Sequence, residues 1–271
     1  MVQPSIDLVA LDLDGTLLDG NEGISPANRR AIHACLQLGV RIVLVTGRGA
    51  DAPARLVREL NLNVPAICAH GAITKDFLSG RTYVHIPVPL QYAVPMVEFG
   101  EANDLSVAVY VEERFYRRIG AEIYMEDMRG PHWCEVPSLT SLLGSAPTFI
   151  RFLGRESVEA MREAFPNTPV HFKYETWGEF EECAITSLEA TKKNALERLC
   201  NDLGIRAANV MAIGDSRNDV PMMRWAGVGV AMGNAAPDVI RAVGRVTAAC
   251  HEDGVARAIE RYVIAPQERS A

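Results

Sequence analysis

Short apolar runs alternate with helical patterns at both ends of the chain, and this alternation restricts the fold more than any other feature. The first three runs cover residues 8–11, 42–45 and 64–68. Between the first two runs, the Ser-Pro pair at 25–26 is typical of a helix N-cap and first turn. Apolar residues then recur at helical spacing over residues 27–38. The order strand, helix, strand, helix, strand predicts a parallel sheet with helices on both faces.

The C-terminal part of the chain repeats this order, whereas the middle does not. We expect C-terminal helices over residues 190–203, 220–225, 237–243 and 254–264, and strands over 210–213 and 228–231. From about 83 to 188, strand-like alternation is mixed with helical segments, as at 107–118 and 157–165. We therefore predict a doubly wound, mostly parallel (Rossmann-like) α/β core from residues 1–84 and 188–271, with an inserted α+β cap domain at 85–187.

Composition narrows the class of protein. The 271 residues are 48% apolar and 23% charged, which is usual for a globular chain. The net charge of −7 argues against a general nucleic-acid binder. No apolar run approaches the roughly 18–20 residues that span a bilayer, and the N-terminus lacks the basic region of a signal peptide. These features predict a cytoplasmic protein without a nucleic-acid or membrane partner, and nothing identifies a protein partner. The scattered cysteines are expected to be reduced thiols.

Acidic and hydroxyl side chains follow three of the predicted strands. Asp12 and Asp14 follow the first, Thr46 follows the second, and Asp215 and Asp219 follow a late one. Ligands of parallel sheets bind beyond the carboxyl ends of the strands, so these side chains should converge there. Two unit charges about 4 Å apart repel by roughly 4 kcal/mol at an effective dielectric near 20, so the cluster requires a cation. Oxygen ligands favour Mg²⁺ over Zn²⁺, and such a site suits a phosphate ester.

The spacing of Asp12 and Asp14 suits nucleophilic and acid/base roles. A carboxylate with an ordinary pKa of about 3.9 is ionised at neutral pH and needs no base to become a nucleophile. Positions two apart at the end of a strand share a face, so Asp12 can attack phosphorus while Asp14 reaches the leaving oxygen. Burial and neighbouring carboxylates are expected to raise the pKa of Asp14 toward that acid/base role.

Four segments carry a family resemblance. LVALDLDGTLLD, IVLVTGR, LEATKKNAL and VMAIGDSRNDVPMMRWAGVGVAMGNA resemble the four motifs of the haloacid dehalogenase superfamily. More closely, they resemble its Cof-type phosphatases, whose cap is inserted between the second and third motifs. The resemblance covers about residues 6–86 and 185–264. It implies a Mg²⁺-dependent phosphatase that hydrolyses a small phosphorylated metabolite through an aspartyl-phosphate, with sugar phosphates as the commonest association.

The resemblance also implies a role for each matching residue. Asp12 would be the nucleophile and a metal ligand, and Asp14 the acid/base whose backbone carbonyl also contacts the metal. Asp215 would bind the metal, with Asp219 either a ligand or an indirect support. The remaining residues would contact phosphate: the amides of Leu13 and Gly47, and the side chains of Thr46, Lys192 and Asn218.

Several alternatives stay open at this point. Lys193 stands where the family often has glycine after its lysine, so Lys192 competes with Lys193 for the site. Thr46 could instead cap the next helix, and Arg48 could be either functional or part of a structural ion pair. His70 replaces a commoner asparagine. The chemistry could also be that of a phosphomutase or a dehalogenase, or the chain could be a non-catalytic binding protein.

Two groups in the inserted segment have a functional and a structural interpretation. The aromatic residues Tyr110, Phe115, Tyr116 and Trp177 could line a substrate pocket, although such residues more often form the core. The acidic run of Glu179, Glu181 and Glu182 is expected to be a solvated face.

Overall fold

The computed structural model describes residues 5–20, 23–121, 132–177 and 180–268. The chain divides into two compact units, each described by itself below. The first contains Met1–Arg48, Ala52–Tyr83 and Thr191–Ala271, and the second contains Gly49–Asp51 and Val84–Ala190.

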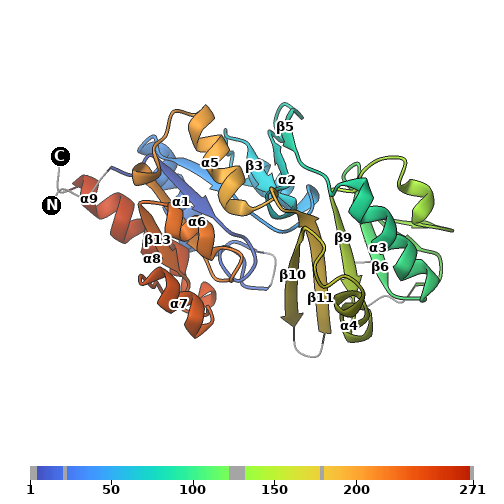
Figure 1. The fold of residues 1–271 in the computed structure, drawn as a ribbon. Helices are drawn as coiled ribbons and strands as arrows, with labels where there is room; N and C mark the ends of the chain where they lie inside the picture. The colour runs from blue at the N-terminus through green and yellow to red at the C-terminus, as the bar shows by residue number, and fades with distance from the viewer. Residues whose placement is uncertain (1–4, 21–22, 122–131, 178–179, 269–271) are drawn as a thin grey trace. The chain divides into compact units, whose positions relative to one another are not determined.

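The first unit is built on a parallel sheet (Figure 1). Its four strands lie in the order β13-β12-β1-β2, and every neighbouring pair is parallel. A parallel bridge from Val45 to Ile67 continues this sheet toward β3, which forms a small sheet in the order β3-β4-β5. The strands are β1 (Leu8–Leu11), β2 (Arg41–Leu44), β3 (Ala66–Cys68), β4 (Ile73–Lys75), β5 (Thr82–His85), β12 (Val210–Gly214) and β13 (Val228–Ala231).

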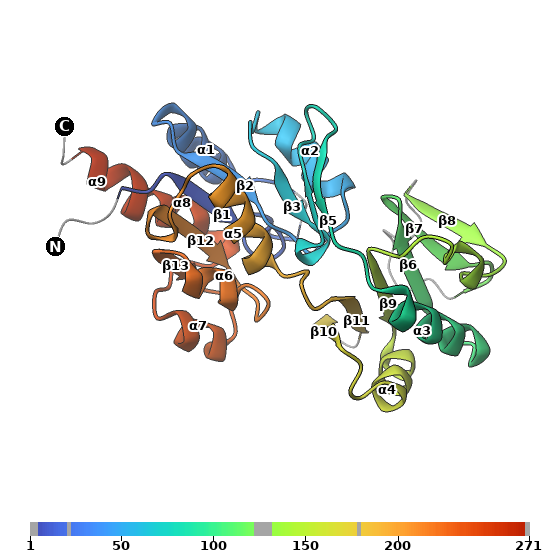
Figure 2. The same ribbon diagram turned by 45° about the horizontal axis from the view of Figure 1, so that its top comes forward.

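Helices cover both faces of this sheet. On one face, Leu8, Ala10 and Val43 pack in a common core with residues of α5, α6 and α7, and Figure 2 shows α5 and α6 together in front of the strands. The alternate strand residues Val9 and Ile42 are fully buried too, and α1 packs against both β2 and α8. The predicted doubly wound parallel core is therefore confirmed. The helices are α1 (Pro26–Gln37), α2 (Asp51–Glu59), α5 (Lys192–Asp202), α6 (Val220–Trp225), α7 (Pro237–Val243), α8 (Gly254–Ile259) and α9 (Ala265–Glu268).

Local capping explains where two of these helices begin. The Ser25 hydroxyl accepts a hydrogen bond from the Asn28 amide at 3.1 Å, and Pro26 opens α1 as expected. Helix α5 begins at Lys192, two residues later than the sequence pattern predicts. The reason is that Thr191 is its N-cap, with a hydroxyl that accepts from the Asn194 amide at 3.0 Å. This cap places Lys192 in the first turn of the helix.

The C-terminal helix differs from the single helix expected over 254–264. Helix α8 ends at Ile259, and the chain continues through a π-helical segment, Glu260–Ile264, into α9.

Among the described residues, none of the helices combines the length and apolar character needed to cross a membrane. All six cysteines lie in the described ranges and are free thiols, as predicted.

The second unit is an α+β unit, as predicted. Its six strands lie in the order β10-β11-β9-β6-β7-β8, antiparallel except for the β7–β8 pair. Helices α3 (Leu90–Ala102) and α4 (Arg155–Ala164) contribute Met96 and Met161 to a core with Phe152 and Ile185 of the sheet. The strands are β6 (Val107–Val111), β7 (Arg114–Arg118), β8 (Trp133–Val136), β9 (Phe149–Leu153), β10 (Val170–Trp177) and β11 (Phe180–Ser187).

Three of the four aromatic residues singled out in the sequence belong to the core of this unit or pack against it. Tyr110 and Phe115 are buried, and Tyr116 packs against the main core. Tyr110 stacks on Phe149 with ring centroids 4.9 Å apart. The structural interpretation therefore holds for these three, while the side chain of Trp177 lies outside what the structure describes.

The prediction of a solvated acidic face is wrong for Glu182. Its side chain is only 3% exposed and forms an ion pair with Arg151. Because β11 pairs with β9, and Arg151 lies opposite Ala184, the two charged side chains share one face of the sheet. Glu181 points the other way and pairs with Arg155 at 3.0 Å. Glu179 lies outside the described residues.

Candidate active site

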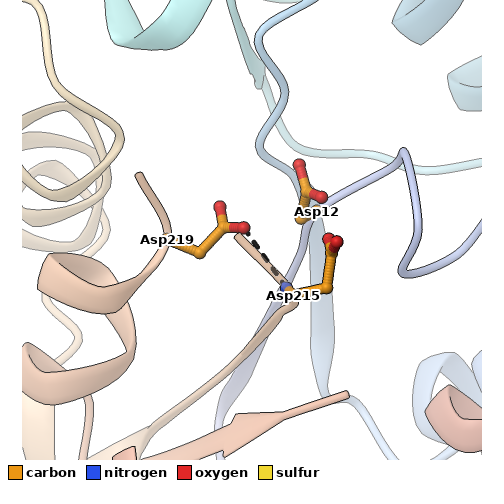
Figure 3. A group of neighbouring side chains, drawn as sticks. All are labelled: Asp12, Asp215 and Asp219. Carbon is orange, nitrogen blue, oxygen red and sulfur yellow. Dashed lines mark hydrogen bonds between the residues drawn. The ribbon is translucent and has the colours of Figure 1, made fainter. Parts of the chain in front are cut away.

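Three carboxylates meet at the carboxyl ends of β1 and β12. Asp12 directly follows β1, and its amide donates to the carbonyl of Ile213 at 3.1 Å, which continues the ladder between these strands. Asp215 directly follows β12, and Asp219 comes four residues later. One carboxylate oxygen from each of Asp12, Asp215 and Asp219 lies within 4.8 Å of the others. Figure 3 shows the Asp12 and Asp215 carboxylates close together, with Asp219 beside them.

Lys192 enters this cluster from the first turn of α5. Its Nζ lies 2.6 Å from an oxygen of Asp12 and 2.6 Å from an oxygen of Asp219, and its side chain is almost completely buried. Lys193 instead pairs with Glu197 at 2.6 Å along the helix surface. The structure thus brings Lys192, and not Lys193, to the carboxylates.

The loop after β12 is organised around Asp219. While one Asp219 oxygen accepts from Lys192, the other accepts from the amides of Asp215 at 3.3 Å and Ser216 at 3.0 Å. The dashed line in Figure 3 marks the first of these amide contacts. Asn218 is half-buried on the same loop, with its side-chain oxygen 2.6 Å from the Ser216 hydroxyl. These contacts fix Asp219 in place and leave Asp215 directed toward Asp12.

The loop after β1 packs closely on Asp215. The Thr16 hydroxyl donates to an Asp215 oxygen at 3.0 Å. Gly15 has a φ of 71°, and a Cβ at this position would lie 2.6 Å from an Asp215 oxygen, so glycine is required on both grounds. The sequence does not predict the contact between Thr16 and Asp215. The only sequence signal for it is the position of the hydroxyl directly after the Asp-Gly turn.

Thr46 and Gly47 form the turn after β2. Thr46 is fully buried, and its hydroxyl accepts from the Arg48 amide at 3.0 Å. Helix α2 begins only at Asp51, so Thr46 does not cap it. A Cβ on Gly47 would lie 2.5 Å from the buried ring of His70, which explains the need for glycine in this turn.

Leu13 and Asp14 lie between these groups on the β1 loop, but their side chains have different surroundings. The Leu13 side chain is fully buried, whereas that of Asp14 is 55% exposed. Asp14 does not join the carboxylate cluster, so the prediction that it is buried beside other carboxylates is wrong. Its two oxygens accept from Nε of Arg48 at 3.0 and 2.9 Å, and one also accepts from Nη2 at 2.5 Å. Arg48 therefore forms an ion pair, but its partner is itself a candidate site residue, so the ion pair does not exclude a functional role.

Burial and mutual repulsion dominate the electrostatics of the cluster. Burial, and then the charge of Asp219, raise the pKa of Asp12 well above its ordinary value even though Lys192 acts in the opposite direction. Burial and Asp219 likewise raise the pKa of Asp215 to about 6. Burial alone would lower the pKa of Lys192, but the charges of Asp12 and Asp219 outweigh it and raise that pKa. Lys192 therefore stays protonated, whereas burial and mutual repulsion disfavour the ionised forms of Asp12 and Asp215 in the absence of a cation.

The donor set fits a divalent cation. With all three carboxylates ionised beside the Lys192 ammonium, the cluster would carry a net charge of −2, which one divalent ion would neutralise. Among the described residues, the candidate ligands of this cluster are carboxylate oxygens, which hard cations prefer.

Comparison with known proteins identifies the family. A family model described as haloacid dehalogenase-like hydrolase matches residues 9–259. The chain belongs to this family. Enzymes of the family generally use a divalent metal, in agreement with the acidic cluster.

Relatives and solved structures agree with this family assignment. YxeH of Bacillus subtilis, which is named as a phosphatase, is 32% identical to this chain. The match spans 95% of this chain and 98% of YxeH. The solved structure of a haloacid dehalogenase-like hydrolase from Bacteroides thetaiotaomicron is 25% identical, with a TM-score of 0.84. The match spans 95% of this chain and 99% of that structure. The subclass IIB sugar phosphatase BT4131 is 23% identical, with a TM-score of 0.80 over 94% of this chain and 98% of BT4131. At this identity the similarity supports the fold alone.

Proposed function

We propose that this protein is a Mg²⁺-dependent phosphatase that hydrolyses a small phosphorylated metabolite through an aspartyl-phosphate on Asp12. The observation that carries the proposal is the position of Asp12. Its carboxylate lies at a strand end, beside a buried lysine and within 4.8 Å of two further carboxylates. Phosphoryl transfer requires this combination of a positioned nucleophile and balanced charge.

Asp12 and Asp14 divide the chemistry in this proposal. In the first step, an Asp12 oxygen forms a bond to phosphorus while the ester P–O bond breaks, and Asp14 gives a proton to the leaving alcohol. In the second step, water attacks the phosphorus, Asp14 takes its proton, and the bond between Asp12 and phosphorus breaks to release inorganic phosphate. Each step moves one proton through Asp14 and leaves the enzyme unchanged after a full cycle.

The phosphate contacts come from four parts of the first unit. We propose that the Leu13 and Gly47 amides and the Thr46 hydroxyl bind phosphate oxygens. Lys192 would neutralise charge that develops on the transferred group, and Asn218 would donate from its side-chain amide. Thr46 already accepts the Arg48 amide, so its hydroxyl hydrogen remains to be directed at the phosphate.

The proposed magnesium ligands are Asp12, Asp215 and the backbone carbonyl of Asp14. When bound, the cation would neutralise charge on the phosphate oxygens and favour the ionised carboxylates. For Asp219 we propose an indirect role, because its oxygens accept from Lys192 and from the loop amides of Asp215 and Ser216.

The two units would then have different tasks. We propose that residues 1–84 and 188–271 form the phosphatase core and residues 85–187 a cap that excludes bulk water and selects the substrate. A sugar phosphate is the substrate class we propose. The proposal is supported by the resemblance to Cof-type phosphatases and by the similarity in fold to the sugar phosphatase BT4131.

The direct test is phosphate release from p-nitrophenyl phosphate and from a panel of phosphorylated metabolites, with Mg²⁺ or with a chelator. We expect Mg²⁺-dependent release and a preference for sugar phosphates by kcat/KM. Dependence on a bisphosphate activator would instead indicate a phosphomutase, and halide release without Mg²⁺ would indicate a dehalogenase. No turnover from about pH 5 to about pH 9, the range in which such acid/base groups work, would favour a non-catalytic protein.

Replacement of Asp215 by alanine should raise the Mg²⁺ requirement sharply. The reason is that one of the proposed ligands is lost, and we expect a shift of about 10- to 100-fold in the half-saturating Mg²⁺ concentration. The matched control is Glu59→Ala, which removes an acid that pairs with Arg29 outside the cluster. An unchanged metal titration for Asp215→Ala would count against its role as a ligand.

The affinity for Mg²⁺ should fall as the pH is lowered through about 6. The pKa of Asp215 is about 6 in the folded protein without a metal, above its value of about 3.9 in an unfolded chain. Between these values the folded state binds more protons, so the metal-free protein loses stability as the pH rises. A cation binds only the ionised carboxylate, so each displaced proton should weaken apparent binding by up to about tenfold per pH unit below 6.

Thermal-shift titrations with Mg²⁺ at about pH 5 and about pH 7 measure this effect, which rests on proton competition. Equal affinities at the two values would contradict the proposed link between Asp215 and the metal. Glu59→Ala should show the same pH dependence as the wild type.

A further inference from the structure

We propose that Arg48 is a positioning residue that holds the Asp14 carboxylate in the orientation from which it exchanges protons with the leaving group and with water. This inference rests on the proposed function, because it assigns the acid/base role to Asp14. Arg48 is then a further residue of the proposed site, and it influences the reaction only through Asp14.

The contact between the two side chains is a fork. Nε of Arg48 lies 3.0 and 2.9 Å from the two Asp14 oxygens, and Nη2 lies 2.5 Å from one of them. The planar guanidinium fixes both the position and the plane of the carboxylate, which a lysine ammonium does not.

Both ends of this pair are anchored by their main chains. The Arg48 amide donates to Thr46 Oγ1 at 3.0 Å, and its carbonyl accepts from the Ala69 amide at 2.8 Å. On the other loop, the backbone of Asp14 forms an isolated β-bridge with Leu18, and the Gly15 amide donates to the Leu18 carbonyl at 3.1 Å. The ion pair therefore connects two fixed loops, one after β1 and one after β2.

The exposure of Asp14 explains why positioning is needed. The Asp14 side chain is 55% exposed and that of Arg48 is 31% exposed. A carboxylate so open to solvent has several accessible rotamers, and the arginine fork selects one of them. Ion pairs at this exposure contribute little to stability, so a purely structural role predicts almost no effect of removing the arginine.

A comparison of two leaving groups distinguishes a misplaced Asp14 from a correctly positioned one. As the bond from Asp12 to phosphorus forms and the ester bond breaks, an alkoxide must receive a proton, whereas p-nitrophenolate leaves without one. A misplaced Asp14 therefore slows alkyl phosphates more than p-nitrophenyl phosphate. Because kcat/KM reports only the steps up to release of the first product, it separates this effect from the later hydrolysis.

The experiment measures kcat/KM for p-nitrophenyl phosphate and for the alkyl phosphate that the wild type hydrolyses best. For Arg48→Ala we expect the alkyl value to fall by about 10- to 100-fold more than the aryl value. Arg48→Lys should restore little of this loss. Asp14→Asn should shift the ratio in the same direction, and adding Arg48→Ala to Asp14→Asn should not shift it further.

The matched control is Arg29→Ala, because Arg29 pairs with Glu59 at 2.5 Å and is exposed to a similar extent. It should leave the ratio unchanged. Since both substrates are assayed on one preparation, the ratio does not depend on the fraction of folded enzyme. An unchanged or raised preference for the alkyl ester in Arg48→Ala would overturn the inference, whereas failure of the wild type to hydrolyse either substrate would overturn the proposed function.

Discussion

Replacement of Asp12 by asparagine should reduce phosphate release by a factor on the order of 10⁴ or more, as expected for loss of a nucleophile. The amide is nearly isosteric with the carboxylate but does not attack phosphorus. Steady-state release of phosphate from p-nitrophenyl phosphate measures the effect. Retention of more than a few per cent of the activity would remove Asp12 as the nucleophile.

The fold of this variant should persist, which separates a chemical effect from unfolding. Asp12 is buried beside Asp215 and Asp219, and their repulsion contributes to its raised pKa. Removal of one negative charge lowers that repulsion, and Lys192 keeps its ion pair with Asp219 at 2.6 Å, so we expect the Tm in Mg²⁺-free buffer to stay close to that of the wild type. A strongly lowered Tm would mean that the loss of activity reflects unfolding.

Lys192→Ala and Lys193→Ala should differ greatly, although the residues are neighbours. Lys192 contacts Asp12 and Asp219 at 2.6 Å in the interior, whereas Lys193 pairs with Glu197 at the surface. We expect Lys192→Ala to lower kcat by about 10²- to 10³-fold, the usual cost of removing one charge-stabilising group. Lys193→Ala should stay close to wild type.

Stability measurements provide a second readout for the same pair of variants. Loss of one partner from a buried ion pair destabilises a protein by about 3–5 kcal/mol. We expect Lys192→Ala to show such a decrease in Mg²⁺-free buffer, with partial recovery on addition of the ion. Equal losses of activity in the two variants, or a larger loss in Lys193→Ala, would contradict the assignment.

The sequence predicts the core well because local pattern and tertiary burial agree there. Strand residues such as Val9 and Ile42 are buried on both faces of a parallel sheet, so their apolar runs are continuous. The convergence of Asp12 and Asp215 follows from the same rule, because parallel neighbours end at one edge. The family motifs then distinguish these acids from ordinary turn residues.

The features that the sequence did not predict depend on register or on side-chain direction. Glu182 is buried because β9 lies beside β11 and provides Arg151, a partner 31 positions away. Thr16 and Asp215 are separated by 199 positions. The pairing of Arg48 with Asp14 requires the relative positions of two loops, which motif spacing does not specify.

The most direct measurement of the central claim is to capture the phosphate on Asp12. In Asp14→Asn, p-nitrophenyl phosphate should still transfer its phosphoryl group, because its leaving group needs no acid, but hydrolysis of the intermediate should be slow. Acid quenching during turnover with Mg²⁺, followed by peptic digestion and mass spectrometry, should show one added HPO₃ on the peptide that contains Asp12. The Asp12→Asn, Asp14→Asn double variant should show none. Phosphate on another residue, or on no peptide while p-nitrophenol is released, would contradict the account.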